Sequence, residues 1–210
     1  MLKNFVKFIF QNFSATLFFL LLISCKSNAL QSVTDSDFNA FLLRAEQLND
    51  RDPKAALLLL NAHKDELISQ PITQQVNYYR IQSSAYADQA LYSLSSAAAE
   101  QGLKLAKQLN NPSIFIAELA YTKGFSLESL GDFDGAVQFY QNGLDVARSM
   151  NNQELTARGL INIGAIFYLR KDYKQSLITL NNALVLANTI ADEALLGDIN
   201  SELGILYGNL

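Results

Sequence analysis

Few residues of this sequence have the chemistry and the spacing of a catalytic or metal-binding site. The chain holds one His and one Cys among its 210 residues, which excludes an intramolecular disulfide and a Cys/His metal cluster. His63 is followed by Lys64, Asp65 and Glu66, and three adjacent charges are typical of a solvated helix surface. No nucleophile has a plausible His partner, and no phosphate loop or H-E-x-x-H motif occurs. We therefore expect no enzyme, no catalytic residue, no metal and no cofactor.

Asp132 and Asp134, in the segment Gly-Asp-Phe-Asp-Gly, weakly suggest a cation-binding loop. A calcium loop of the helix–loop–helix type also needs a bidentate Glu at its end, and this segment has none. A tight turn between two helices explains both aspartates.

That turn belongs to residues 121–152, which we interpret as two amphipathic helices joined by Leu-Gly-Asp-Phe. The segment recurs along the chain: adding 40 to a position takes Gly124 to Gly164 and Phe133 to Tyr173, and adding 40 again reaches Gly204. Subtracting 41 takes Gly143 to Gly102. A fixed period near 40 residues is typical of a solenoid of stacked helix pairs.

The repeat predicts an all-α architecture of consecutive helix pairs. Residues 35–70 match the repeat poorly and are interpreted as an N-terminal capping pair, its second helix starting at Asp52-Pro53 and ending near Ser69. The array then covers residues 71–210 as repeats 71–111, 112–152 and 153–192 and an incomplete repeat 193–210. Its helices are expected near 72–90, 93–110, 113–130, 133–150, 153–170 and 173–190, with a further one from Glu193.

The pattern resembles tetratricopeptide repeats in their long form of about 40 residues. When the capping pair is counted as the first repeat, the fourth repeat (153–192) carries Ile163-Gly164, Phe167 and Tyr173, with Ser176 for the usual small Ala. In the third repeat the pattern falls on Gly124, Gly131-Asp132-Phe133 and Ala136, whereas Lys123 departs from the usual Leu. The resemblance implies a right-handed solenoid of antiparallel helix pairs.

Glycines inside helices need a structural reason, because each costs about 1 kcal/mol relative to alanine. We expect the partner helix to pack against bare backbone at Gly124, Gly164 and Gly204. Ala136 and Ser176 are expected to allow the same approach from the other side. The aromatic side chains of Phe133 and Tyr173 are expected to wedge the turns. All of these are interpreted as scaffold residues.

In such repeats the first helix of each pair lines the concave groove, so function is expected on its exposed positions. A mixture of Tyr, Asn and both charges there suits a peptide or protein segment. In register with the glycines, the candidate residues are Arg80, Glu118, Tyr121, Phe125, Glu128, Arg158, Asn162, Tyr168 and Glu202.

Residues 1–24 have the layout of a signal peptide for export. Lys3 and Lys7 precede a short apolar run, Ala15 to Ile23, and no acidic residue occurs before Asp35. The run is too short to span a hydrocarbon core of about 30 Å.

Leu22-Ile23-Ser24-Cys25 resembles the bacterial lipobox, in which the Cys is lipidated and becomes the first mature residue. Cys25 would then anchor the protein in the cell envelope, in the outer membrane if the cell has one, with 25–34 as a tether. Two alternatives stay open: ordinary cleavage after Ala29, in Ser27-Asn28-Ala29, and an uncleaved anchor.

The net charge is acidic and disfavours nucleic acid as a partner. The whole chain has a formal charge of −4, and removing residues 1–24 with Lys3 and Lys7 leaves 14 basic and 20 acidic residues, hence −6. Binding of nucleic acid depends on Lys and Arg that neutralise phosphates. No small-molecule substrate is evident either.

The last residues, Ser201 to Leu210, are predicted to form an apolar helix with no following partner in the sequence. Either the chain is a piece of a longer protein or this helix pairs with another molecule. The favoured function is a protein-binding scaffold of the bacterial cell envelope. The alternative is the sensory part of a membrane signalling protein whose diguanylate cyclase or histidine kinase domain is absent from this chain.

Overall fold

The computed structural model describes residues 37–111 and 113–209. The expected signal peptide, Cys25 and the tether therefore lie outside the described residues. The chain divides into two compact units after Phe41, and residues 37–41, the described part of the first unit, are helical. The second unit, Leu42–Leu210, contains the repeats.

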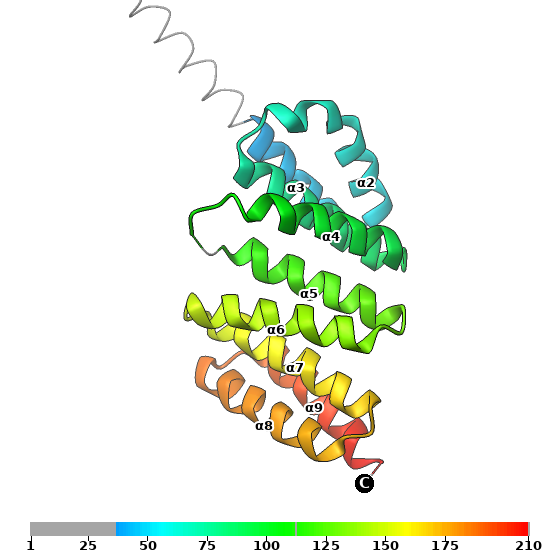
Figure 1. Ribbon diagram of the computed structural model, residues 1–210, viewed down its shortest axis with the longest axis vertical. Helices are drawn as coiled ribbons and strands as arrows, with labels where there is room; N and C mark the ends of the chain where they lie inside the picture. The colour runs from blue at the N-terminus through cyan, green and yellow to red at the C-terminus, as the bar shows by residue number, and fades with distance from the viewer. Residues whose placement is uncertain (1–36, 112, 210) are drawn as a thin grey trace, which may run out of the picture. The chain divides into compact units, whose positions relative to one another are not determined.

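All secondary structure within the described residues is helical, which confirms the predicted all-α class (Figure 1). At the start of the second unit, residues 42–49 are helical. The helices that follow are α2 (Pro53–Ala62), the 3-10 helix η1 (Lys64–Ser69), α3 (Ile72–Asp88), α4 (Tyr92–Ala106), α5 (Ile114–Ser129), α6 (Phe133–Ser149), α7 (Gln153–Leu169), α8 (Tyr173–Ile190) and α9 (Glu193–Tyr207). None of these described helices combines the length and the apolar character needed to cross a membrane.

The helices pack as consecutive pairs, as the repeat predicts. α3 packs on α4, α5 on α6, and α7 on α8, and each pair also contacts the helix that follows it (Figure 1). The first helices α3, α5, α7 and α9 contact one another in succession, so they form one layer of the stack. This layer is where the candidate groove residues lie.

One backbone motif makes the turn between helices short. After α5, Gly131 adopts a left-handed conformation (φ 84°), and the N–H of Asp132 donates to the carbonyl of Leu127 over 2.8 Å. This is the pattern that closes helices with a left-handed residue. It recurs at four non-glycine residues with φ between 53° and 62°: Ala90, Asn151, Lys171 and Ala191.

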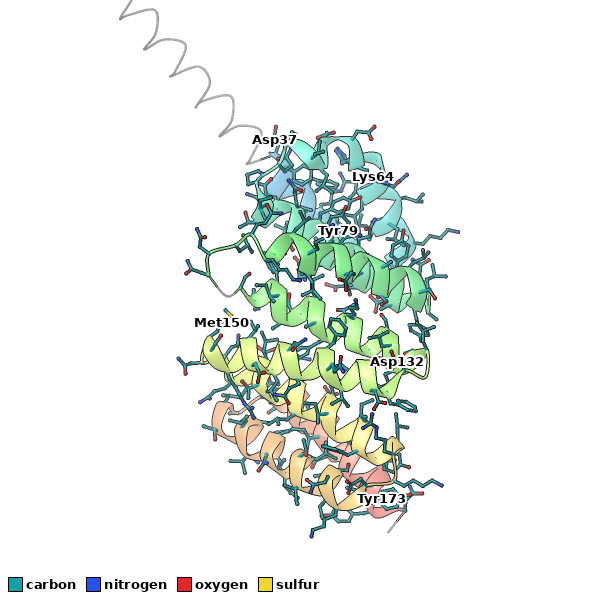
Figure 2. All side chains as sticks on the ribbon, viewed as in Figure 1. Asp37, Lys64, Tyr79, Asp132, Met150 and Tyr173 are labelled. Carbon is teal, nitrogen blue, oxygen red and sulfur yellow. The ribbon has the colours of Figure 1, made fainter. Side chains whose placement is uncertain are left out.

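The residue after the left-handed one usually starts the next helix. Asp132 accepts a hydrogen bond from the N–H of Gly135 (2.9 Å), and Asp172 does the same for Gln175 (3.2 Å). Each side chain thereby satisfies one of the free N–H groups at a helix N-terminus. Figure 2 shows Asp132 and Tyr173 at one edge of the stack and Met150, the C-cap residue of α6, at the opposite edge.

We predict opposite effects for glycine substitutions at two equivalent turns. A non-glycine residue in the left-handed region costs about 1–2 kcal/mol, partly offset by the extra flexibility of glycine in the unfolded chain. Gly131→Ala should therefore lower the melting temperature by roughly 2–4 °C, and Lys171→Gly should raise it by a similar amount. A side chain at position 131 would meet no atom within 4 Å, so only the backbone is tested. Shifts of the same sign in the two variants would contradict this account of the turn.

The repeated glycines lie where a neighbouring side chain comes too close for a methyl group. A Cβ on Gly124 would lie 2.5 Å from Cδ1 of Tyr140, and a Cβ on Gly164 would lie 2.9 Å from Cδ2 of Leu180. Both neighbours belong to the second helix of the same pair. Gly204 departs from this expectation, because a Cβ there would meet nothing within 4 Å. No described helix covers that face of α9.

Small residues face these glycines from the second helix. Ala136 is fully buried, and the hydroxyl of Ser176 donates to the carbonyl of Gly164 over 2.9 Å. The repeat 71–111, which has Ser83 in place of the glycine, makes the same contact with Ser95, whose hydroxyl donates to the carbonyl of Ser83 over 2.8 Å. A serine on the second helix can thus replace the usual alanine, because its hydroxyl donates a hydrogen bond to a buried carbonyl of the first helix.

The turn aromatics Phe133 and Tyr173 are half-buried and pack against the hydrophobic core. The ring of Tyr173 lies 5.8 Å from that of Tyr168 on the preceding helix.

The single helix expected from Pro53 to near Ser69 is wrong in its second half. The N-terminal half is as expected: Asp52 caps α2, accepting from the N–H of Ala55 over 2.9 Å. The α-helix ends at Ala62, and after His63 the chain forms the 3-10 helix η1. Leu67 is the one buried residue of η1, so little apolar packing holds this segment to α-helical geometry.

Candidate functional site

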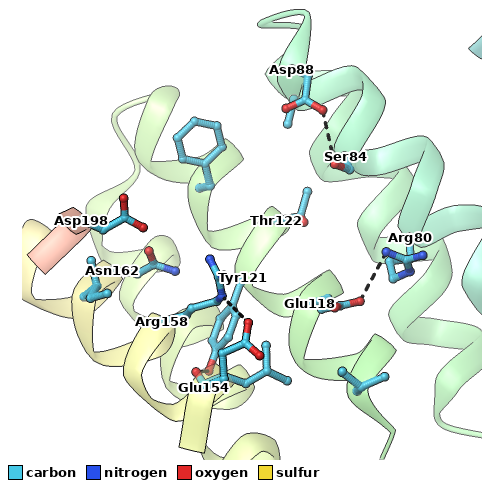
Figure 3. Close-up of a pocket in the computed structure, with 15 residues that line it drawn as sticks. Arg80, Ser84, Asp88, Glu118, Tyr121, Thr122, Glu154, Arg158, Asn162 and Asp198 are labelled. Atoms are coloured by element: carbon cyan, nitrogen blue, oxygen red, sulfur yellow. Dashed lines mark hydrogen bonds and ion pairs between the residues drawn. The ribbon is translucent and has the colours of Figure 1, made fainter. Parts of the chain in front are cut away.

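A pocket of about 620 Å³ lies on the layer of first helices (Figure 3). Pockets of roughly 300–1,000 Å³ are the usual size of binding sites. Every lining residue belongs to α3, α5, α7 or α9: Arg80, Ser84, Ala87, Asp88, Ile114, Glu118, Tyr121, Thr122, Phe125, Glu154, Leu155, Arg158, Ile161, Asn162 and Asp198.

The repeat explains how side chains far apart in sequence reach one pocket. Glu118, Arg158 and Asp198 are spaced by 40 and occupy the same position on α5, α7 and α9. Thr122 and Asn162 form a second row, one helical turn further along α5 and α7. Stacking the helix pairs therefore places these rows side by side.

Arg80 is the most enclosed cation of the pocket, with a side chain that is 14% exposed. Its guanidinium bonds Glu46 and lies 3.5 Å from the Glu118 carboxylate, as Figure 3 shows for Glu118. The same guanidinium lies 5.2 Å from the ring centre of Phe115, within range of a cation–π contact. Arg80 is thus held by groups of its own chain.

Arg158 is also paired, with Glu154 one turn earlier on α7 at 3.1 Å. Asp88 accepts hydrogen bonds from Asn49 (2.8 Å) and Ser84 (3.4 Å) but has no ion pair within the described chain, and neither has Asp198. The pocket lining counts two arginines against four acids, Asp88, Glu118, Glu154 and Asp198, so its formal charge is −2. The charges left for a ligand are acidic.

Burial raises the pKa of Glu118 above its ordinary value of 4.5. The positive charge of Arg80 opposes the rise, and the negative charge of Glu46 adds to it. A carboxyl group in this position can take up a proton more readily than a surface glutamate.

Two aromatic candidates differ in how much surface they offer. Tyr121 is only 8% exposed, and its hydroxyl donates to the carbonyl of Leu155 over 2.8 Å. Phe125 is 45% exposed and packs edge-to-face on Tyr92, with ring centres 5.8 Å apart. Phe125 therefore presents an apolar surface to a ligand, whereas Tyr121 mainly joins helices.

Six of the nine predicted groove residues line the pocket: Arg80, Glu118, Tyr121, Phe125, Arg158 and Asn162. The other three, Glu128, Tyr168 and Glu202, do not. Glu128 accepts a hydrogen bond from the buried Tyr140 hydroxyl over 2.6 Å, and Tyr168 accepts one from the Asn209 amide over 3.0 Å. Glu128 and Tyr168 thus form hydrogen bonds with other residues of the same chain.

The prediction omitted several lining residues that the period could have found. Adding 40 to Arg158 gives Asp198, and subtracting 40 from Asn162 gives Thr122. Ser84 lies four residues after Arg80, and Glu154 lies four before Arg158, so each shares a helix face with a predicted residue. The period and the helical spacing together identify the lining better than either alone.

Glu128 gives a pH-dependent prediction. Burial raises its pKa above 4.5, the Tyr140 hydrogen bond opposes the rise, and the charge of Glu202 adds to it. The folded state therefore binds the Glu128 proton more tightly than the unfolded state does. The folding stability that this proton contributes is complete below pH 4.5 and is lost as pH rises through the pKa of the folded state. Wild-type protein should lose stability relative to Glu128→Gln as pH rises from 4.5 towards neutral. Thermal melts across that range test this, and a difference that stays constant with pH would contradict it.

Within the described residues, no group of three His, Cys, Asp or Glu side chains is placed to hold a metal ion. His63 lies in the turn between α2 and η1, with Nδ1 3.0 Å from the Glu66 carboxylate. This is a local contact between exposed residues on the surface.

No protein-family model matches the sequence, and no curated protein matches it significantly. Solved structures with a similar fold include the following two. The apo form of RapI superimposes with a TM-score of 0.69 at 15% identity, over 77% of this chain and 60% of RapI. BtubC from P. vanneervenii superimposes with a TM-score of 0.62 at 15% identity, over 85% of this chain and 83% of BtubC. The chain thus has a helical-repeat fold and spans about 60% of the length of RapI.

Proposed function

We propose that this protein is a non-enzymatic scaffold that binds a peptide or protein segment in the pocket formed by α3, α5, α7 and α9. The observation that carries the proposal is the lining itself, which comes from four successive first helices and from no second helix. An extended segment lying across these helices would meet each repeat in turn.

The chemistry of the lining favours a segment with basic side chains. Both arginines are already paired within the protein, whereas Asp88 and Asp198 have no ion pair among the described residues. Ser84, Thr122 and Asn162 add hydroxyl and amide groups that can bond a peptide backbone. Phe125 adds an exposed ring for an apolar side chain.

The proposal is tested by blocking the pocket with bulky side chains. Thr122→Arg/Asn162→Arg adds two long cations to the lining. The matched control Thr189→Arg/Asn181→Arg makes the same two changes at exposed positions of α8. Affinity purification from the source cells, with quantitative mass spectrometry, should show partners lost from the first variant and retained by the control. Equal recovery of all partners with both variants would contradict the proposal.

We also propose that the repeats are of the long tetratricopeptide type and that the protein is exported and anchored by a lipid on Cys25. The spacing of Gly124, Gly164 and Gly204 supports the first part, and Leu22-Ile23-Ser24-Cys25 supports the second. Cells that make the protein should incorporate labelled palmitate into it. Labelling that persists in Cys25→Ser would refute the anchor.

A further inference from the structure

A second pocket, of about 390 Å³, lies on the other side of the stack, above α5 and between the second helices α4 and α6. It shares no lining residue with the pocket described above. Its lining is mostly apolar and consists of Glu100, Leu103, Lys104, Ala106, Lys107, Ile116, Ala120, Phe139, Asn142 and Val146.

The pocket exists because α5 carries a small residue, Ala120, at its base. Ala120 is buried and ends at its Cβ. One repeat later, 40 residues on, the equivalent residue is Leu160, which is buried in the hydrophobic core. The position equivalent to Ile116 is likewise occupied by a different residue, Thr156. The side chains at these two positions therefore differ between α5 and α7. The third repeat thus leaves space that a leucine at position 120 would occupy.

The rim of the pocket carries uncompensated positive charge. Lys104 lies in the last turn of α4 and Lys107 is the C-cap residue just after it; both are exposed and make no ion pair with any described residue. The acid of the lining, Glu100, is already bonded by Lys123, whose ammonium also lies 4.3 Å from the ring centre of Phe139. Asn142, on the opposite wall, adds an exposed amide that can donate a hydrogen bond.

We infer that this pocket binds an aliphatic monocarboxylate, with its chain on Leu103, Ile116 and Phe139 and its carboxylate at Lys104 and Lys107. The apolar side chains at the base of the pocket are complementary to the aliphatic chain of such a molecule, and the two neighbouring lysines are complementary to its carboxylate. The volume lies at the lower end of the range for small ligands. A stable protein–protein interface needs about 800 Å² on each partner, more than this small patch offers. The sequence had shown no sign of a small-molecule ligand.

Calorimetric titration of the full chain with decanoate, kept below its micelle concentration, tests the inference. We expect saturable binding of one molecule per chain, weaker binding of decanol, and loss of binding in Ala120→Leu. Lys104→Gln/Lys107→Gln changes only exposed side chains and should weaken binding by about three- to tenfold, as expected for partly exposed ion pairs. The control Lys171→Gln/Lys174→Gln removes two equally spaced exposed lysines elsewhere and should leave binding unchanged.

Three results would overturn the inference: no saturable binding of decanoate, binding that persists in a folded Ala120→Leu variant, or equal affinity for decanol and decanoate. Binding of an acidic amphipathic peptide that Ala120→Leu abolishes, in a protein that ignores decanoate, would assign the pocket to a protein partner instead. The melting curve of each variant shows whether it is folded. If Ala120→Leu does not fold, the inference is tested by the weaker decanoate binding expected for Lys104→Gln/Lys107→Gln.

Discussion

Gly124→Ala is expected to destabilise the protein by about 2–3 kcal/mol, although alanine is the better helix former. The new methyl group would lie 2.5 and 2.6 Å from two ring carbons of Tyr140. That ring is 1% exposed, and its hydroxyl donates to Glu128 over 2.6 Å, so it cannot move aside without losing packing and a hydrogen bond. Chemical denaturation followed by circular dichroism measures the change.

Gly204→Ala is the matched control, because Gly204 occupies the same repeat position in α9. A Cβ there meets nothing within 4 Å, so only helix propensity acts and the variant should gain up to about 1 kcal/mol. The two substitutions are chemically identical and differ only in the covering helix. Equal effects at both positions would show that close approach does not explain the repeated glycine.

Tyr121→Ala is expected to cost about 3–5 kcal/mol, the usual range for truncating a buried aromatic residue. The ring on α5 packs against the backbone of two other helices, at Gly143 of α6 and Gly159 of α7. A Cβ on Gly159 would lie 2.5 Å from the Tyr121 hydroxyl oxygen. Removing the ring therefore opens a cavity where three helices meet.

Tyr121→Phe separates the ring from its hydroxyl. It keeps the packing and removes only the hydrogen bond to the Leu155 carbonyl, so it should cost about 1 kcal/mol. Urea melts of both variants distinguish the two contributions. A Tyr121→Ala variant as stable as wild type would mean that Tyr121 is a surface residue available to a partner, which was its interpretation from sequence.

The sequence predicted the helix pairs well, because their determinants repeat within it. Glycine, a small residue and a turn aromatic recur every 40 residues, and the observed helices begin within one residue of the expected starts from α3 to α9. The prediction failed where the repeat ends. The break of α2 at His63 and the uncovered Gly204 depend on which neighbours are present, and the sequence pattern does not state that.

The candidate site was harder to predict than the fold. Helical spacing shows which face a residue shares, but not whether its side chain is already used. Tyr121 and Glu128 fit the expected face, yet Tyr121 packs between glycines and Glu128 bonds Tyr140. The pocket above Ala120 was not predicted at all, since it depends on the absence of volume at one position.

The most direct test of the groove is photocrosslinking at two matched asparagines. Asn162 lines the pocket on α7, and Asn181 is exposed on the second helix α8. A benzophenone amino acid would replace each in turn, in the full chain produced in the source cells. Our account predicts discrete crosslinked partners at position 162 and none at position 181. Partners captured at position 181 alone, or equally at both positions, would contradict binding in the layer of first helices.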